Sequence, residues 1–163
     1  MQGFTHFDKN GAAVMVDVSG KEATQRVATA MGTIRVSAAV MEAVLGGTVK
    51  KGDVLGVARV AGIMAAKRTS ELIPLCHILL LSNCQIEFET AAEEGRITAY
   101  CTVKTEGKTG VEMEAIVGVQ IALTTIYDMC KAIDKEMVIS DVCLLEKQGG
   151  KSGHFTRSLR PQD

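Results

Sequence analysis

The chain of 163 residues contains no tryptophan, and aromatic residues make up only 4% of it. Proteins that hold single-stranded nucleic acid stack its bases on aromatic side chains, so this class is disfavoured. The formal net charge is −1, from 18 basic and 19 acidic residues. Because no overall positive field would attract DNA, RNA or an anionic lipid surface, we expect neither nucleic acid nor a membrane as a partner.

Metal-binding and export signals are lacking as well. The five cysteines are widely spaced, include no Cys-x-x-Cys motif and are odd in number, which disfavours a disulfide framework or a cysteine-rich zinc site. The three histidines, His6, His77 and His154, also lack ligand spacing, so we predict no metal site. No basic segment followed by an apolar one opens the chain, and the most apolar stretch, 115–127, is shorter than the roughly 20 residues of a membrane span. We therefore expect a soluble protein of the reducing cytoplasm.

Hydrophobic residues make up 47% of the chain and there are only two prolines, which predicts a packed core rather than disorder. A β-hairpin flanked by helices predicts an α+β fold with helices on one face of a mostly antiparallel sheet. We expect one domain over residues 1–153 and a flexible C-terminal tail over 154–163. The predicted strands are 13–18, 79–90, 96–104 and 138–145; the predicted helices are 38–45, 54–72 and 110–133; and 24–36 is compatible with either.

Two segments could hold a small anionic ligand. Lys108-Thr109-Gly110 leads directly into the last predicted helix, whose free backbone N–H groups and dipole favour an anion. The alternative is an ordinary loop with solvated lysines. Cys76 and His77 lie within an almost wholly apolar run, which indicates either a titratable group in a desolvated pocket or a core histidine with satisfied hydrogen bonds.

Asp128 and Lys131 are three residues apart on a predicted helix, so their side chains are neighbours. They could act as an acid/base pair or lie on a solvated face. Several basic residues in separate segments indicate a polyanionic small molecule, such as a phosphorylated one, as ligand, although each alone is compatible with a surface charge. These residues are Arg26, Lys51, Lys67, Lys131, Lys147 and Lys151.

Four ordered motifs resemble one family closely, the cyclic pyranopterin monophosphate synthases of molybdenum-cofactor biosynthesis (the MoaC family). The motifs are Leu75-Cys76-His77, Lys108-Thr109-Gly110-Val111-Glu112-Met113-Glu114-Ala115, Ile126-Tyr127-Asp128-Met129-Cys130-Lys131-Ala132 and Gly149-Gly150-Lys151-Ser152-Gly153. The resemblance implies a ferredoxin-like fold and a hexamer built as a trimer of dimers. It also implies a reaction that converts 3′,8-cyclo-7,8-dihydroguanosine 5′-triphosphate to cyclic pyranopterin monophosphate and releases pyrophosphate. No redox cofactor or tightly held metal is implied, beyond Mg²⁺ that could accompany the triphosphate.

The same resemblance implies roles for individual residues. Asp128 corresponds to the family's active-site carboxylate, and general acid/base work is expected of Asp128, Lys131, Lys51 and His77. Contacts with the substrate are expected from Leu75, Cys76, His77, Glu112, Met113, Arg26, Lys67, Lys147 and Lys151. One departure is Ile78, where the family usually has proline, which would remove a backbone donor.

Two other functions are compatible with the sequence. A non-catalytic oligomeric module that binds a phosphorylated nucleotide would keep the basic segments but would not need Asp128 beside Lys131. A purely structural protein would use its helix of small residues, between Val54 and Leu72, only to build an oligomer.

Overall fold

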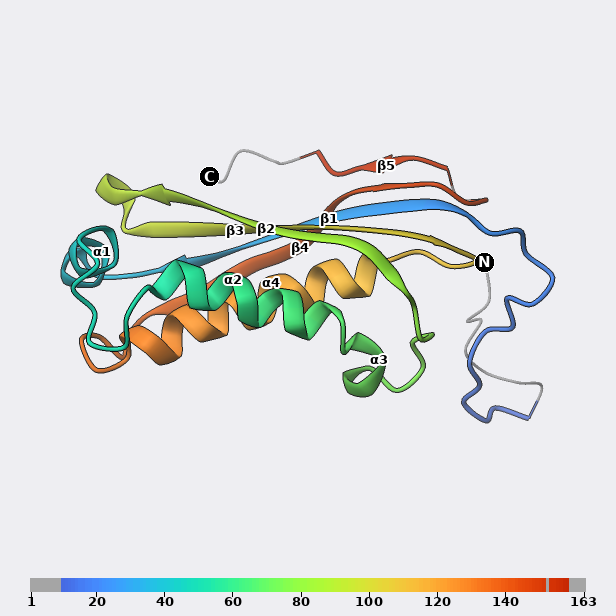
Figure 1. Cartoon of the computed structure of the whole chain (residues 1–163), viewed down its shortest axis with the longest axis horizontal. Coiled ribbons are helices and arrows are strands. Elements are labelled where there is room, and N and C mark those ends of the chain that lie inside the picture. Colours follow the sequence, from blue (N-terminus) through green and yellow to red (C-terminus); the bar gives the residue numbers. More distant parts are fainter. Residues whose placement is uncertain (1–9, 152, 159–163) are drawn as a thin grey trace.

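A five-stranded sheet with its main helices on one face forms the body of the protein (Figure 1). The computed structural model describes residues 10–151 and 153–158. Neighbouring strands are antiparallel throughout, in the order β2-β3-β1-β4-β5. The strands are β1 (Thr24–Arg35), β2 (Leu81–Ala91), β3 (Arg96–Gly107), β4 (Val138–Gln148) and β5 (Phe155–Thr156). The helices are α1 (Ala38–Leu45), α2 (Val54–Ala66), α3 (Thr69–Leu72), α4 (Glu112–Cys130) and the 3₁₀ turn η1 (Ala92–Glu94).

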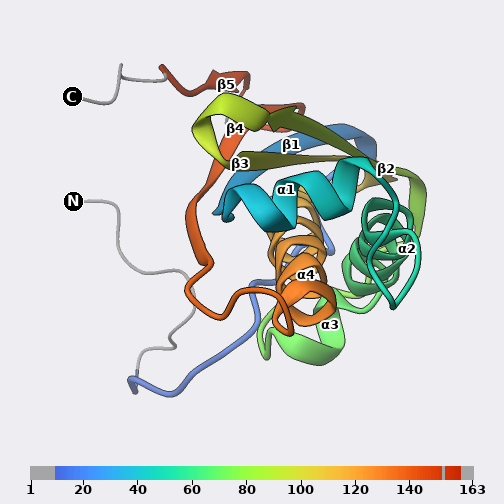
Figure 2. The same ribbon diagram turned by 90° about the vertical axis from the view of Figure 1, so that its left-hand side faces the viewer.

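The chain order β1-α2-β2-β3-α4-β4 with sheet order β2-β3-β1-β4 is the split βαβ arrangement of ferredoxin-like folds. Seen from the end, α2 and α4 lie together below the sheet, while β5 lies at the far edge (Figure 2). This confirms the predicted α+β class with helices on one face. The segment 24–36, left undecided by its composition, is the central strand β1 because its alternate residues are buried between β3 and β4.

The core lies between the sheet and α4. On β1, Ala28, Ala30 and Ile34 are fully buried and alternate toward the helix, as strand geometry requires. Gly32 continues this row, and a Cβ placed there would come within 2.8 Å of Leu123 on α4. The small side chains of β1 therefore let α4 approach the centre of the sheet closely.

The two long helices run antiparallel and touch through glycines. A Cβ on Gly62 of α2 would stand 2.7 Å from the carbonyl oxygen of Gly118 on α4, and one on Gly118 would stand 3.6 Å from Cβ of Ala66. At the opposite end, Lys51, just before α2, contacts Asp128 near the end of α4. The packing of α2 on α4 thus decides which loops meet which end of α4.

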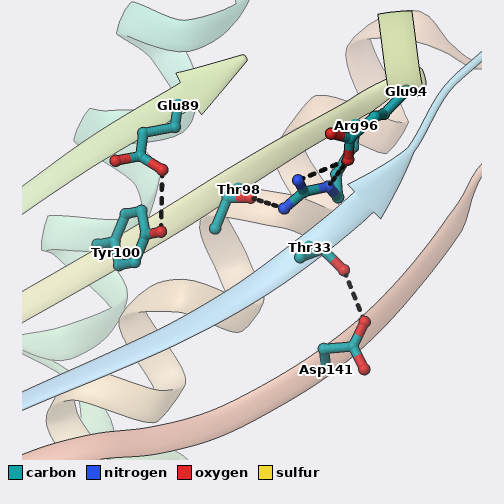
Figure 3. A network of polar contacts seen from close by, with 7 residues as sticks. All are labelled: Thr33, Glu89, Glu94, Arg96, Thr98, Tyr100 and Asp141. Atoms are coloured by element: carbon teal, nitrogen blue, oxygen red, sulfur yellow. Dashed lines mark hydrogen bonds and ion pairs between the residues drawn. The ribbon is translucent and has the colours of Figure 1, made fainter. Parts of the chain in front are cut away.

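The open face of the sheet carries polar side chains that bond to one another (Figure 3). The hydroxyl of Tyr100 donates to Glu89 Oε2 at 3.0 Å, and Nη1 of Arg96 donates to Thr98 Oγ1 at 3.2 Å. Thr33 Oγ1 donates to Asp141 Oδ2 at 3.1 Å, where β4 bulges and Asp141 adopts a φ of 56°. Within the described ranges no helix covers this face (Figures 1 and 2).

Two predicted elements differ from the structure. The strand prediction for 13–18 is wrong: only an isolated bridge forms at Ala13, and Val16 and Val18 line a pocket rather than join the sheet. The single helix predicted over 54–72 is two helices, α2 and α3. The hydroxyl of Thr69 donates to the carbonyl of Ala66 at 3.0 Å, which competes with the continuing helical ladder.

The C-terminal residues described extend the sheet. β5 pairs with β4 beside Lys147, and His154 Nε2 lies 2.7 Å from Glu146 Oε1. Residues 159–163 of the segment expected to be a tail lie outside the described residues. α4 is long and apolar enough to cross a membrane by length and composition, but it is the buried helix of this core.

Candidate functional site

A pocket of about 410 Å³ opens at the N-terminal end of α4. The loop before β2 and the loop before α4 form two of its walls, and the segment ahead of β1 forms a third. The lining residues are Val16, Val18, Lys21, Leu75, Cys76, His77, Leu79, Thr109, Gly110, Glu112, Met113 and Glu114. The structure therefore brings together five residues that the sequence analysis selected as substrate-contacting: Leu75, Cys76, His77, Glu112 and Met113.

His77 is half-buried in this pocket and has a defined partner. Its Nε2 atom lies 2.8 Å from the carbonyl oxygen of Val16. Because a carbonyl only accepts, the hydrogen of the neutral ring is on Nε2, and Nδ1 remains as an acceptor. His77 is thus not a core histidine: its ring presents a proton-accepting nitrogen at the pocket.

Glu112 forms an ion pair with Lys147 across the pocket mouth. Nζ of Lys147 lies 3.0 Å from Glu112 Oε1, and the two side chains are only 23% and 28% exposed. Lys147 reaches this position from β4, directly beside Ala28 of the central strand. Glu112 and Lys147, both predicted to contact substrate, therefore pair with each other, and this ion pair links the first turn of α4 to β4.

Glu114 is a pocket residue that the sequence analysis did not select. It is buried, and burial raises the pKa of its carboxyl, with the nearby charge of Glu112 adding to the effect. Burial and the charge of Glu114 likewise raise the pKa of Cys76, so this cysteine is a thiol rather than a reactive thiolate. Lys21, also not selected, lines the same pocket. The sequence could have indicated Glu114, because it lies two residues from Glu112 in the first turn of α4. Nothing in the sequence around Lys21 indicates a site residue.

A second cluster lies at the other end of α4. Asp128 Oδ2 is 2.8 Å from Nζ of Lys51, and Oδ1 is 2.7 Å from Nζ of Lys131. The hydrogen bonds from Lys131 and Lys51 lower the pKa of Asp128 to about 2, and Asp128 raises the pKa of Lys131. At neutral pH the cluster is thus a carboxylate between two ammonium groups, all three about half exposed.

These two clusters are far apart within one chain. Sixteen residues of helix separate Glu112 from Asp128, which corresponds to about 24 Å at 1.5 Å per residue. His77 accordingly does not meet Asp128, Lys131 or Lys51 in a single copy, although all four were expected to act together. Each end of α4 holds part of the predicted site.

Comparison with known proteins identifies the family of the chain. A family model described as "MoaC family" matches residues 15–150. The chain belongs to the MoaC family. Three curated relatives, each named cyclic pyranopterin monophosphate synthase, illustrate the similarity. The chain is 57% identical over 151 residues to one from Clostridium perfringens strain 13, covering 93% of this chain and 96% of the relative. It is 59% identical to one from Clostridium botulinum (93% and 96% covered) and 58% identical to one from Desulfitobacterium hafniense (94% and 93% covered).

The remaining basic residues expected in a MoaC site are spread around the pocket end. Lys67 is the exposed C-cap residue of α2. The pKa of the Cys84 thiol is lowered mainly by its hydrogen bond with Cys101 and further by the charge of Lys67. Lys151 is exposed on the turn after β4. Lys108, in the loop with free helix N–H groups, donates to the carbonyl of Ser19 at 2.7 Å. Arg26 is buried, and its Nε donates to the carbonyl of Gly107 at 3.2 Å.

Ile78, the departure from the MoaC pattern, is 87% exposed. Leu80, two residues on, is 90% exposed, and both residues lie within three positions after His77. Two aliphatic side chains exposed to water beside a pocket mark a surface whose burial against another surface is favourable, because it removes apolar area from water.

Proposed function

We propose that this chain is a cyclic pyranopterin monophosphate synthase that converts 3′,8-cyclo-7,8-dihydroguanosine 5′-triphosphate to cyclic pyranopterin monophosphate and releases pyrophosphate. The reaction closes a phosphate ring onto the sugar as a P–O bond to pyrophosphate breaks, which makes the enzyme a phosphorus–oxygen lyase. The observation that carries the proposal is the carboxylate of Asp128 held between the ammonium groups of Lys51 and Lys131. The names of the relatives supply the product, cyclic pyranopterin monophosphate.

General acid/base catalysis is the proposed mechanism. The low pKa of Asp128 keeps it ionised, so it orients the two lysines and stabilises positive charge rather than delivering a proton itself. Lys131 and Lys51 donate protons to groups that leave or gain negative charge, and Nδ1 of His77 accepts one. The buried carboxyl of Glu114 adds a proton donor to the pocket, since its pKa is raised. Lys67, Lys147, Lys151 and Lys21 hold the triphosphate and the departing pyrophosphate.

A complete site needs two copies of the chain. Within one copy the pocket with His77 and the cluster with Asp128 lie at opposite ends of α4, and one substrate must reach both. A twofold dimer can bring the pocket end of one copy to the Asp128 end of the other, which yields two equivalent sites. The exposed Ile78 and Leu80 beside the pocket supply apolar surface for this contact. We propose that three such dimers form the hexamer, and sizing in solution tests its mass.

No resident redox cofactor or metal enters this mechanism. Any Mg²⁺ arrives on the triphosphate of the substrate, where it is part of the ligand. The five cysteines are free thiols, in keeping with a protein of the reducing cytoplasm.

The deciding experiment supplies purified protein with the cyclic dihydroguanosine triphosphate and follows both products. Release of pyrophosphate together with cyclic pyranopterin monophosphate supports the proposal. Binding of the triphosphate with no turnover would replace it with the non-catalytic nucleotide-binding module. If the protein neither binds the triphosphate nor turns it over, the purely structural role is the one that remains.

A further inference from the structure

Two buried polar side chains lie side by side beneath the pocket. Arg26 on β1 and Thr105 on β3 are direct partners in the β1–β3 register. Both point toward the helix-covered face, in line with Ala28 and Val103, and are 9% and 3% exposed. They lie at the end of the sheet where the pocket opens and bond to the loops that line it, although neither is itself a lining residue.

Each of these side chains bonds to the backbone of a loop that carries pocket residues. The hydroxyl of Thr105 donates to the carbonyl of Leu80 at 2.6 Å, which anchors the segment from Leu75 that holds Cys76 and His77. Nε of Arg26 donates to the carbonyl of Gly107 at 3.2 Å, which anchors the loop leading to Glu112. The two loops that line the pocket are therefore tied to adjacent residues of β1 and β3.

Arg26 also sets the position of the turn after β4. A Cβ on Gly150 would overlap Nη1 of Arg26, and one on Gly149 would overlap the carbonyl oxygen of Gln25. Both glycines have positive φ, 95° and 76°; the guanidinium lies against Gly150, and Cδ of Arg26 lies close to Gly149. This turn follows β4, the strand that supplies Lys147, so the position of Lys147 beside Glu112 depends on the same side chain.

We propose that Arg26 and Thr105 are positioning residues, which set the distance between His77, Glu112 and Lys147 without touching substrate. The inference rests on the proposed function, and it changes one expectation from the sequence, in which Arg26 contacts the triphosphate or base. The guanidinium acts on the backbone of Gly107 and Gly150. Thr105 acts on the backbone of Leu80.

The first test compares three threonine variants by kcat, KM and melting temperature. Thr105→Val keeps the shape and removes the hydroxyl; a misplacement of about 1 Å is expected to lower kcat about 10²-fold with KM nearly unchanged. Thr105→Ser restores the hydroxyl and most of kcat. Thr98→Val is the matched control, since Thr98 is an equally buried threonine on β3 whose hydroxyl bonds to Arg96 on the open face (Figure 3). Equal losses of kcat in Thr105→Val and Thr98→Val would overturn the inference.

The second test separates positioning by Arg26 from direct binding. Arg26→Lys keeps the charge but lacks the planar fork that reaches Gly107 and Gly150 together, so it is expected to lose as much kcat as Arg26→Gln. Retained kcat with a raised KM in Arg26→Lys would mean that the charge meets the triphosphate, and would overturn the inference. Gly150→Ala is then introduced into both the wild type and the Arg26→Lys variant. The loss of kcat is expected to be larger in the wild type, because the smaller head group of lysine leaves room for the new methyl group. Additive losses would contradict the packing.

Amide hydrogen exchange provides a readout that needs no turnover. Thr105→Val is expected to speed exchange in residues 75–80, and Arg26→Gln in 107–111 and 149–151, with the rest of the sheet unchanged. If the wild type does not turn over the intermediate, the proposed function fails while this readout still tests the anchoring. If it does turn over and the exchange pattern is unchanged in both variants, the positioning role fails alone. Should Arg26→Gln not fold, the threonine variants decide.

Discussion

Asp128 Oδ2 lies 2.8 Å from Nζ of Lys51, and this ion pair joins the C-terminal end of α4 to the loop before α2. Lys51 also donates to the backbone carbonyl of Asp128 at 2.9 Å. The lysine therefore binds both the side chain and the helix end, where a positive charge is favoured by the dipole. An exposed ion pair adds little to stability, so in the proposed mechanism the role of this contact is to position Lys51.

Asp128→Asn tests the importance of this carboxylate. The amide is nearly the same size but carries no charge, so both ammonium groups lose their orienting partner. We expect at least about a 10²-fold loss of kcat, as for a residue that directs proton transfer. The matched control is Glu94→Gln, which removes another exposed carboxylate, paired with Arg96 away from the site. Turnover near the wild-type rate in Asp128→Asn would remove the residue from the mechanism.

The same variant reports on stability in acid. The pKa of Asp128 in the folded protein is about 2, below its ordinary 3.8, so the contribution of its charge to folding is present above about pH 4. That contribution is lost as the pH falls from 3.8 toward 2. We therefore expect wild type to melt slightly above Asp128→Asn at pH 5 and the two to converge near pH 2. A difference that grows as the pH falls through this window would contradict the lowered pKa.

Mixing inactive variants tests whether the site is shared between copies. Asp128→Asn and His77→Ala each remove one half of the proposed site. If a dimer has two sites, each using His77 of one copy and Asp128 of the other, a mixed dimer retains one intact site. Unfolding and refolding an equal mixture should then recover about one quarter of the wild-type rate, since half of the dimers are mixed and half of their sites are intact.

No recovery above the two parent variants would place both residues in sites within one copy, which the 19-residue length of α4 opposes. The control mixes Asp128→Asn with Lys131→Ala. These two residues lie on the same end of α4, so each mixed dimer carries one defect in each site and no recovery is expected.

The contact between α2 and α4 is open to a stability test. In Gly62→Ala the new methyl group would overlap Cδ1 of Ile86 and approach the carbonyl oxygen of Gly118 to 2.7 Å. Overpacking of this kind is expected to lower the free energy of unfolding by about 1–3 kcal/mol, despite the better helix propensity of alanine. Urea unfolding measures it, with Gly20→Ala as control because a Cβ on Gly20 has no neighbour within 4 Å. A gain in stability in Gly62→Ala would contradict the close helix contact.

Local patterns predicted most elements of this fold. Ser37 and Asp53, which precede the predicted helices 38–45 and 54–72, cap α1 and α2, because short polar side chains accept from free N–H groups at a helix start. The hairpin of β2 and β3 follows from two β-rich runs around Glu93-Glu94-Gly95, where Gly95 adopts a φ of 58°. The strand prediction for 13–18 failed because a short apolar run with one polar residue indicates only a partly buried segment, and a pocket wall can hold its apolar side chains as well as a sheet can.

The candidate site residues could be predicted from the sequence, because motifs such as Leu75-Cys76-His77 and the Asp128–Lys131 pair are local. The length of α4 also followed from its period, and with it the distance between Glu112 and Asp128. Contacts between segments distant in sequence decided which loop meets which end of α4. The glycine contact of α2 with α4 places Lys51 at Asp128, and the β1–β3 register places Arg26 beneath the pocket. Such pairings depend on packing between residues up to about 80 positions apart, which no local pattern encodes.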